Sequence, residues 1–283
     1  MVDIRLCAFS DEAATGLDGQ IEAMLDNGIK YLEVRGVDGR NISDLSAGEV
    51  KQLNEKLDSH GLAVWSIGSP IGKINISDDF KAHLEKFKHT MEIACSTGAR
   101  VMRIFSFYVE DGTASQYRDI VMERLSRFIE LSEGSGVLLC HENEKGIYGD
   151  TPEHCLDICS SVKGIRAVFD PANFIQCNSD PLKAWELLEK HIEYLHIKDA
   201  DNTGANVPAG TGIGHIPEII KRYYDKGGRV LSLEPHLWSF EGLSALEKDG
   251  KAHVANAANT QRRAFDLGVE SLKKILAEEI RNE

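Results

Sequence analysis

Four short apolar stretches in the second half of the chain each end in a side chain that can bind a metal ion. These side chains are Glu142, Asp170, His196 and Glu234. The stretch from Ile192 to Ala200 changes from apolar to polar, as a buried parallel strand does when its end reaches a solvated cleft. Residues two apart in a strand share a face, so His196 and Lys198 point the same way. We expect the four strand ends to meet around one divalent cation.

Three carboxylates and one imidazole form a mostly hard ligand set, which suits Mn²⁺, Mg²⁺, Co²⁺ or Zn²⁺. With the carboxylates ionised, the set carries a charge of about −3, which an apolar cavity does not tolerate without a cation. Any one of these residues alone is more often a helix cap, a solvated loop residue or a hydrogen-bonded core histidine. Four of them in register on consecutive strands favour the metal site.

The elements that must position these residues alternate regularly between strand and helix. The predicted strands are Ile4–Phe9, Tyr31–Arg35, Leu62–Ser69, Val101–Tyr108, Val137–Glu142, Ile165–Asp170, Ile192–Lys198 and Val230–Glu234. The predicted helices are Gln20–Asn27, Ala47–His60, Ser77–Thr97, Ser115–Glu133, Pro152–Val162, Pro181–Lys190, Ile216–Lys226 and a last one from about Ala255 to Glu279. Thr151 and Asp180 are the expected N-caps of the helices that begin at Pro152 and Pro181.

Eight strand–helix units predict a parallel sheet closed into a (β/α)₈ TIM barrel, with residues 1–283 as a single domain. The structural alternative is a doubly wound open sheet. Against it, no Gly-x-Gly-x-x-Gly turn follows the first strand. In a closed barrel the carboxyl ends of the strands crowd around one axis, where active sites lie.

The amino-acid composition limits which binding partners and which cellular compartment we expect. The net charge of −13 argues against a nucleic-acid backbone as the main partner. Neither a signal peptide nor an apolar run long enough for a membrane span is evident. Six scattered cysteines without a Cys-x-x-Cys pair fit reduced thiols. We therefore expect a cytoplasmic protein with a small-molecule substrate and neither a nucleic-acid nor a membrane partner. The last helix is expected to pack on the barrel, and a homo-oligomer contact there stays open.

The motifs around the four residues carry a resemblance. His141-Glu-Asn143, Asp170-Pro-Ala-Asn173, His196-Ile-Lys-Asp199 and Leu233-Glu-Pro-His236, in this order, resemble the xylose-isomerase-like barrel superfamily. Its members include sugar and sugar-phosphate isomerases and epimerases, inosose and 3-dehydroshikimate dehydratases, and AP endonuclease type 2 enzymes. The similarity extends from Phe9 to the last helix. It implies the barrel fold and makes Glu142, Asp170, His196 and Glu234 the metal ligands.

The resemblance also separates the candidate reactions. The endonuclease branch needs three zinc ions and an Asp-x-x-His motif, whereas this chain has Asn173 at the histidine position. With one metal, the expected chemistry is proton transfer next to a carbonyl through a metal-stabilised enediolate. By similarity to the epimerases, Glu142 and Glu234 are both ligands and the acid/base pair. The expected activity is an isomerase or epimerase of a small sugar or sugar-like hydroxy-carbonyl compound. A dehydratase is the alternative, and a non-catalytic sugar-binding barrel is the third reading.

Other residues could touch the substrate. Lys198 could hold an oxyanion or form an internal salt bridge, Asn173 is expected to contact a hydroxyl, and His236 shares the face of Glu234. Glu33, Trp65 and Arg103 lie on predicted strands; Glu33 or Trp65 could line the pocket, but packing in the core or at the rim is the alternative for each. The loop from Gly210 to Gly214 could receive a phosphate, as barrels often do there, but a tight turn is favoured.

Overall fold

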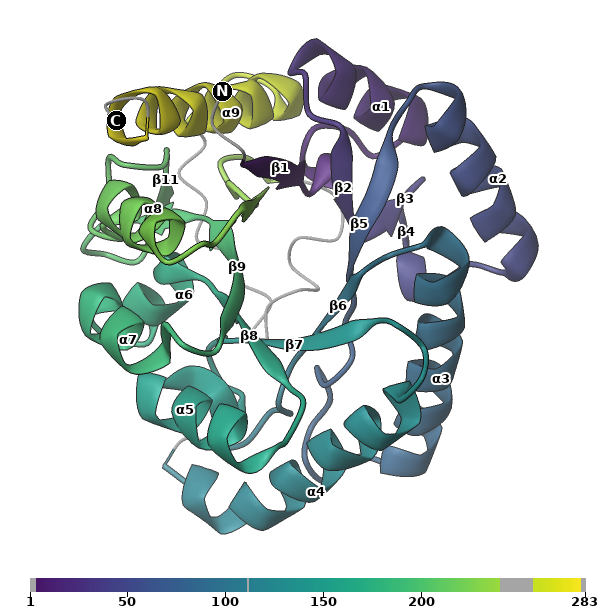
Figure 1. The fold of residues 1–283 in the computed structure, drawn as a ribbon, viewed down its shortest axis with the longest axis vertical. Helices are drawn as coiled ribbons and strands as arrows, with labels where there is room; N and C mark the ends of the chain where they lie inside the picture. Colours follow the sequence, from purple (N-terminus) through teal and green to yellow (C-terminus); the bar gives the residue numbers. More distant parts are fainter. Residues whose placement is uncertain (1–3, 111, 240–256, 281–283) are drawn as a thin grey trace.

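The computed structural model describes residues 4–110, 112–239 and 257–280. In these residues, eight parallel strands close into a barrel, which confirms the predicted fold (Figure 1). In order around the barrel the strands are β1 (Arg5–Ala8), β2 (Tyr31–Val34), β5 (Ala63–Gly68), β6 (Val101–Ile104), β7 (Leu138–Glu142), β8 (Arg166–Phe169), β9 (Ile192–Ile197) and β12 (Val230–Leu233). Strand β12 pairs again with β1, from Arg5 opposite Val230 to Ala8 opposite Leu233.

Helices surround the barrel on its outside (Figure 1). They are α1 (Leu17–Asp26), α2 (Ala47–Ser59), α3 (Phe80–Thr97), α4 (Ala114–Ser132), α5 (Pro152–Ser161), α6 (Pro171–Gln176), α7 (Pro181–Leu188), α8 (Ile216–Asp225) and α9 (Gln261–Glu279), with 3-10 turns at Ser10–Glu12, Ile42–Asp44 and Tyr148–Asp150. The two predicted N-caps are confirmed. The Thr151 side chain accepts the N–H of His154, and the Asp180 carboxylate accepts the N–H groups of Leu182 and Lys183.

Several boundaries differ from the predictions. The last helix begins at Gln261, because the Thr260 side chain accepts the N–H of Arg263 and caps it there; of the earlier predicted start, Ala255 lies outside the described residues. The predicted strand Val101–Tyr108 ends at Ile104. Helix α6 and two hairpins were not predicted. The hairpins are β3 (Gly36–Val37) with β4 (Arg40–Asn41) and β10 (Asp199–Ala200) with β11 (Asn206–Val207).

A layer of buried side chains fills the inside of the barrel. It consists of Cys7, Trp65, Val101, Cys140, Val168 and Tyr194. Because side chains alternate along a strand, the residue two positions further on points inward again, one level higher. That next level holds Arg103, Glu142, Asp170 and His196, all buried. The charged residues at the strand ends therefore lie directly above this apolar layer.

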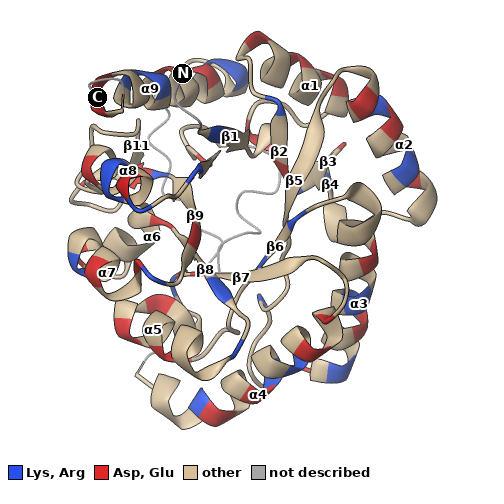
Figure 2. Ribbon diagram, viewed as in Figure 1, with Lys and Arg blue, Asp and Glu red and all other residues tan. Residues whose placement is uncertain are grey.

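The outer helices carry interspersed acidic and basic residues (Figure 2). A separate set of charged side chains is buried at the strand ends, including Glu33, Arg35, Lys198 and Glu234. Burying charges is costly unless they are paired or bind a cation, so this set marks the part of the molecule that needs a functional explanation. Among the described helices, none combines the length and apolar character that a membrane crossing requires.

Candidate metal centre

The four predicted ligands come together at the carboxyl ends of adjacent strands. Glu142 is the last residue of β7, His196 lies in β9, and Asp170 and Glu234 directly follow β8 and β12. One potential ligand atom from each residue lies within 4.8 Å of all the others, and all four side chains are buried. The imidazole nitrogen Nδ1 of His196 is 2.8 Å from Glu142 Oε1 and 3.2 Å from Glu234 Oε2. This convergence is the geometry that the sequence predicted.

The donor atoms fit a divalent cation. Glu142 Oε2, Asp170 Oδ2 and Glu234 Oε2 are buried and accept no hydrogen bond, although Arg103 and Lys198 approach them at ion-pair distance. The two cations offset part of the charge, and three buried oxygens that accept no hydrogen bond leave acceptor capacity free in one place, as a cation site requires. Three carboxylate oxygens and one imidazole nitrogen are the donors that Mg²⁺, Mn²⁺, Co²⁺ and Zn²⁺ accept in proteins.

The charges around the centre do not balance without a cation. Six carboxylates gather there, from Asp11, Glu12, Glu33, Glu142, Asp170 and Glu234. The permanent cations in contact with them are Arg35, Arg103 and Lys198. Carboxylates therefore outnumber cations, and a divalent ion would supply most of the missing positive charge.

The excess of buried carboxylates is reflected in the pKa values of the groups at the centre. Burial raises the pKa of Asp170 to about 7 although Lys198 opposes the shift. Burial likewise raises the pKa of Glu12 to about 8 against the effect of Arg35. Burial alone would lower the pKa of His196, but Glu142 and Glu33 outweigh it and raise the pKa well above its ordinary value. These shifts follow from the burial of several carboxylates close together.

Glu33 of β2 orients the histidine ligand. Its Oε2 lies 3.3 Å from His196 Nε2, while its Oε1 accepts hydrogen bonds from the hydroxyls of Tyr194 (2.7 Å) and Ser66 (3.2 Å). With a hydrogen on Nε2, His196 donates to Glu33 and keeps the Nδ1 lone pair for the centre. The rings of Phe9 and Tyr194 meet the imidazole edge to face at 5.2 and 5.3 Å and hold its plane.

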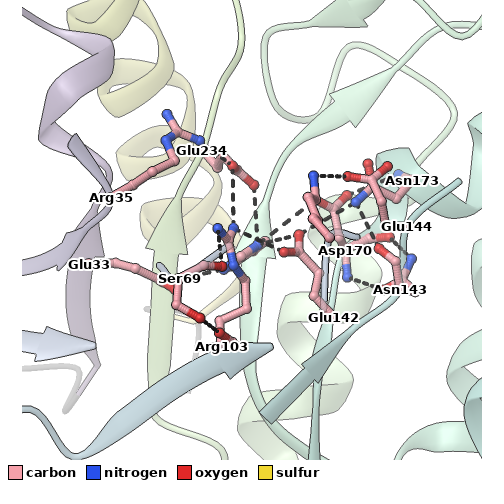
Figure 3. A network of polar contacts seen from close by, with 12 residues as sticks. Glu33, Arg35, Ser69, Arg103, Glu142, Asn143, Glu144, Asp170, Asn173 and Glu234 are labelled. Atoms are coloured by element: carbon pink, nitrogen blue, oxygen red, sulfur yellow. Dashed lines mark hydrogen bonds and ion pairs between the residues drawn. The ribbon is translucent and has the colours of Figure 1, made fainter. Parts of the chain in front are cut away.

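Two buried arginines flank the centre. Arg35 Nη1 lies 2.7 Å from Glu234 Oε1, and its other nitrogens contact Asp11 and Glu12. Arg103 Nη1 lies 3.0 Å from Glu142 Oε2, and its guanidinium packs on the rings of Phe9 and Phe105. Figure 3 shows Arg35 beside Glu234 and Arg103 close to Glu142. The sequence analysis did not assign these arginines to the site. Their inward direction could have been predicted from spacing, because Arg35 follows the inward-facing Tyr31 and Glu33 at two-residue steps and Arg103 lies two residues after Val101.

The pKa values of the two glutamates shift in the opposite direction to that of Asp170. Burial by itself would raise the pKa of Glu142, but His196 and Arg103 outweigh it and lower the pKa to about 2. Burial would also raise the pKa of Glu234, yet Lys198 and His236 lower it well below its ordinary range. Both glutamates are therefore ionised at neutral pH.

The predicted substrate residues border the same centre. Lys198 Nζ lies 2.8 Å from Asp170 Oδ2, so the lysine forms the internal salt bridge that was the alternative to an oxyanion contact. The Asn173 amide donates to the Asn143 carbonyl at 2.8 Å and approaches Glu142 Oε1 at 3.4 Å. His236 Nε2 lies 3.3 Å from Glu12 Oε1 and 3.5 Å from Glu234 Oε1, and its backbone N–H donates to Glu12. Their roles toward a substrate stay predictions.

Comparison with known proteins places the chain among related barrels. It is 26% identical over 200 residues to the uncharacterized protein YihM of Escherichia coli K12, covering 67% of this chain and 53% of YihM. The chain thus spans about half the length of the curated relative that it matches.

Solved structures share the fold at low identity. A D-tagatose 3-epimerase-like protein is 19% identical, with a TM-score of 0.73 over 96% of this chain and 97% of that one. The probable 3-DHS dehydratase AsbF from Bacillus anthracis is 17% identical, with a TM-score of 0.71 over 95% and 98%. The IOLI protein with a bound zinc atom is 17% identical, with a TM-score of 0.74 over 98% and 99%.

The match that decides the family covers most of the sequence. The family model described as a xylose isomerase-like TIM barrel matches residues 21–250, which include all four residues of the centre. The closed eight-stranded barrel agrees with that description. The chain therefore belongs to the family of xylose isomerase-like TIM barrels.

Proposed function

We propose that this protein is a divalent-metal-dependent isomerase or epimerase of a small sugar or sugar-like hydroxy-carbonyl compound. The observation that carries the proposal is the convergence of Glu142, Asp170, His196 and Glu234 within 4.8 Å in a buried site. These four residues would hold the ion. A bound divalent cation would act as a Lewis acid on a substrate carbonyl and make a neighbouring C–H bond more acidic. The zinc atom in the IOLI structure and the epimerase-like neighbour support this choice.

Two glutamates are placed to move the proton. Strands β8 and β9 separate β7 from β12 in the barrel, so Glu142 and Glu234 approach the centre from different sides. Both are ionised at neutral pH, as proton acceptors must be. In an epimerase one ionised glutamate takes the proton from carbon on one face. The other glutamate, after taking up a proton from water, delivers that proton on the opposite face, and the first glutamate then returns its proton to water. In an isomerase the proton returns to the neighbouring carbon.

Three further residues would bind and orient the substrate. Lys198 carries a charged ammonium group, since burial would lower its pKa but Asp170 and Glu234 raise it well above the ordinary value. This group can hold a substrate oxygen as negative charge develops on it. Asn173 and His236 border the centre and can contact substrate hydroxyls.

A dehydratase is the second candidate. The same proton abstraction, followed by loss of a hydroxyl group from the next carbon, gives a lyase. Lys198 favours this candidate, because its ammonium group beside Asp170 could protonate a leaving hydroxyl. The fold similarity to a probable 3-DHS dehydratase is consistent with it.

The test combines metal analysis with a substrate screen. Untreated protein should contain close to one divalent ion per chain, and chelation should remove both the ion and the activity. In D₂O, a panel of ketoses, inososes and 3-dehydroshikimate should yield an isomer with deuterium on carbon and an otherwise unchanged composition. Loss of water from the substrate would identify a dehydratase instead. Tight sugar binding without conversion by metal-loaded protein would show a binding protein and refute the proposal.

A further inference from the structure

The loop that follows β9 surrounds a buried side chain, the carboxylate of Asp199. The Asp199 carboxylate accepts four backbone hydrogen bonds: Oδ1 from Ala200 and Gly214, and Oδ2 from Gly210 and Gly212, each 2.9 or 3.0 Å long. Asp199 is buried, with 1% of its surface exposed. Each oxygen faces two N–H donors, so a proton on either oxygen would point at a donor. Burial raises the pKa of Asp199 above its ordinary value, and the four N–H donors oppose that shift because they bind the ionised carboxylate.

The glycines of this loop are needed for the carboxylate to fit. A Cβ atom at Gly212 would lie 2.5 Å from Asp199 Oδ1 and 2.3 Å from the carbonyl oxygen of Ala200. A Cβ atom at Gly214 would also lie 2.5 Å from Asp199 Oδ1. Side chains at these positions would separate the N–H groups from the anion. The Gly-x-Gly spacing is therefore explained by the internal carboxylate.

Successive backbone N–H groups that surround an anion form the kind of nest that grips phosphate in other proteins. In TIM barrels, substrate phosphate is frequently bound by the loops after the seventh and eighth strands, next to a helix N-terminus. Strand β9 is the seventh strand of this barrel, and the loop leads into α8, where the N-cap His215 forms no side-chain cap. The nest thus lies at the position where TIM barrels often bind phosphate, and its N–H donors already bind the Asp199 carboxylate.

We infer that Asp199 acts as a built-in anion that closes this phosphate position and makes the site selective for unphosphorylated substrates. A phosphate group at the loop would find its N–H partners engaged and would meet the negative charge of the carboxylate. Asp199 directly follows Lys198, so the closed loop lies beside a strand end that carries the candidate centre. The selectivity rests on the proposed function, whereas the closure of the loop by an internal anion does not.

The first test needs neither metal nor turnover. We would compare thermal unfolding of the full chain and its Asp199→Gly variant in chloride, formate and inorganic phosphate at equal ionic strength. Asp199→Gly should unfold at a lower temperature, and formate, which replaces the missing carboxylate, should recover part of the loss. Wild type should respond to formate and phosphate no more than to chloride. Specific stabilisation of wild type by phosphate would overturn the inference.

The matched control is Asp201→Gly in the same loop. The Asp201 carboxylate accepts the N–H groups of Thr203 and Ala205 but lies closer to solvent, so formate should not rescue its loss. Should Asp199→Gly fail to fold, Asp199→Asn replaces one acceptor oxygen by an N–H₂ group that faces the loop donors. It should fold with lower stability than wild type. Equal stability of Asp199→Asn and wild type would contradict an essential anion.

The second test addresses selectivity. Once a substrate is found, kcat/KM is measured for it and for its phosphate ester. We expect at least a tenfold preference for the unphosphorylated compound, and a preference for the ester would refute the selectivity. If no substrate is turned over, the proposed function fails while the formate result still decides whether Asp199 closes the nest.

Discussion

The two halves of the barrel contribute different chemistry to one centre. The second half, strands β7, β8, β9 and β12, supplies the four side chains that can bind an ion. The first half supplies Arg35 and Arg103, which contact the glutamates, and Glu33, which contacts the histidine. The second half thus carries the four candidate ligands, and the first half adds contacts that help to set their charge and orientation. The ligand set alone does not describe the site, because its ionisation depends on residues from the opposite half.

Removal of a proton-transfer group from the second half should have the largest effect. We expect Glu142→Gln and Glu234→Gln each to lower kcat by about 10²–10⁴-fold at saturating metal, the usual contribution of an acid/base group. The measurement is steady-state kinetics on the substrate found by the screen, with circular dichroism to verify folding. Glu193→Gln is the control, because Glu193 lies on β9 but pairs with Arg166 away from the centre. Near-normal rates for both variants would disprove the acid/base assignment.

In the first half, the loss of Arg35 should destabilise the fold. Arg35→Met removes the buried cation that contacts both Asp11 and Glu234, and breaking a buried ion pair in this way typically costs about 3–5 kcal/mol. Urea unfolding of metal-free protein measures the loss. Arg40→Met is the matched control, because the exposed pair of Arg40 with Glu49 should contribute little to stability. Equal losses for the two variants would show that Arg35 does not stabilise the charged cluster.

A smaller effect should appear when the first half no longer orients the histidine. We expect Glu33→Gln to weaken metal binding by about 10–100-fold, as loss of a carboxylate behind a histidine ligand typically does. Calorimetric titration with Mn²⁺ gives the affinity, and ¹⁵N NMR of zinc-loaded protein reports whether His196 Nε2 carries the hydrogen. Tyr194→Phe removes one hydrogen bond to Glu33 and keeps the carboxylate, so its effect should be smaller. Unchanged affinity in Glu33→Gln would argue that the two halves act independently.

The smallest effect concerns pH and a histidine outside the centre. Burial lowers the pKa of His83 to about 4, from about 6.5 in the unfolded chain, and its Nε2 accepts the Gly72 N–H. Below pH 6.5 the unfolded chain takes up a proton that the folded protein does not. Stability is therefore complete above pH 6.5 and falls toward pH 4, by about 2 kcal/mol at pH 5.

Urea unfolding of His83→Gln between pH 7 and pH 4 checks this contribution. The variant should lose less stability across that range than wild type, because one proton fewer distinguishes its folded and unfolded states. Identical slopes would assign the pH sensitivity to other groups, the centre included.

The convergence of the four candidate ligands could be predicted from the sequence better than the contacts that surround them, because the pattern that indicates it is local. Each ligand ends its own apolar run, so its inward direction follows from two-residue alternation within one strand. The contacts of Arg35 with Glu234 and of Glu33 with His196 require barrel closure and the packing across its interior, which no local pattern contains. The strands and most helices were predictable for the same reason that the ligands were.

The missed helix α6 shows the opposite case, in which a local signal was present. Asp180-Pro181 was interpreted as a cap and first helical residue, and the structure confirms it. Asp170-Pro171 has the same form and caps α6, but it was interpreted only as part of a metal motif. Asp170 does both, because Oδ1 accepts the Asn173 N–H at 3.0 Å while Oδ2 faces the centre.

This division of the Asp170 carboxylate has a consequence for ion selectivity. With Oδ1 engaged by the helix start, Asp170 can offer only one oxygen, and His196 offers one nitrogen. Ca²⁺ commonly takes about six to eight oxygen ligands and uses bidentate carboxylates, whereas Mg²⁺ prefers compact octahedral coordination. If the four residues hold a divalent ion, we therefore expect the start of α6 to limit its coordination number and to disfavour Ca²⁺ relative to Mg²⁺.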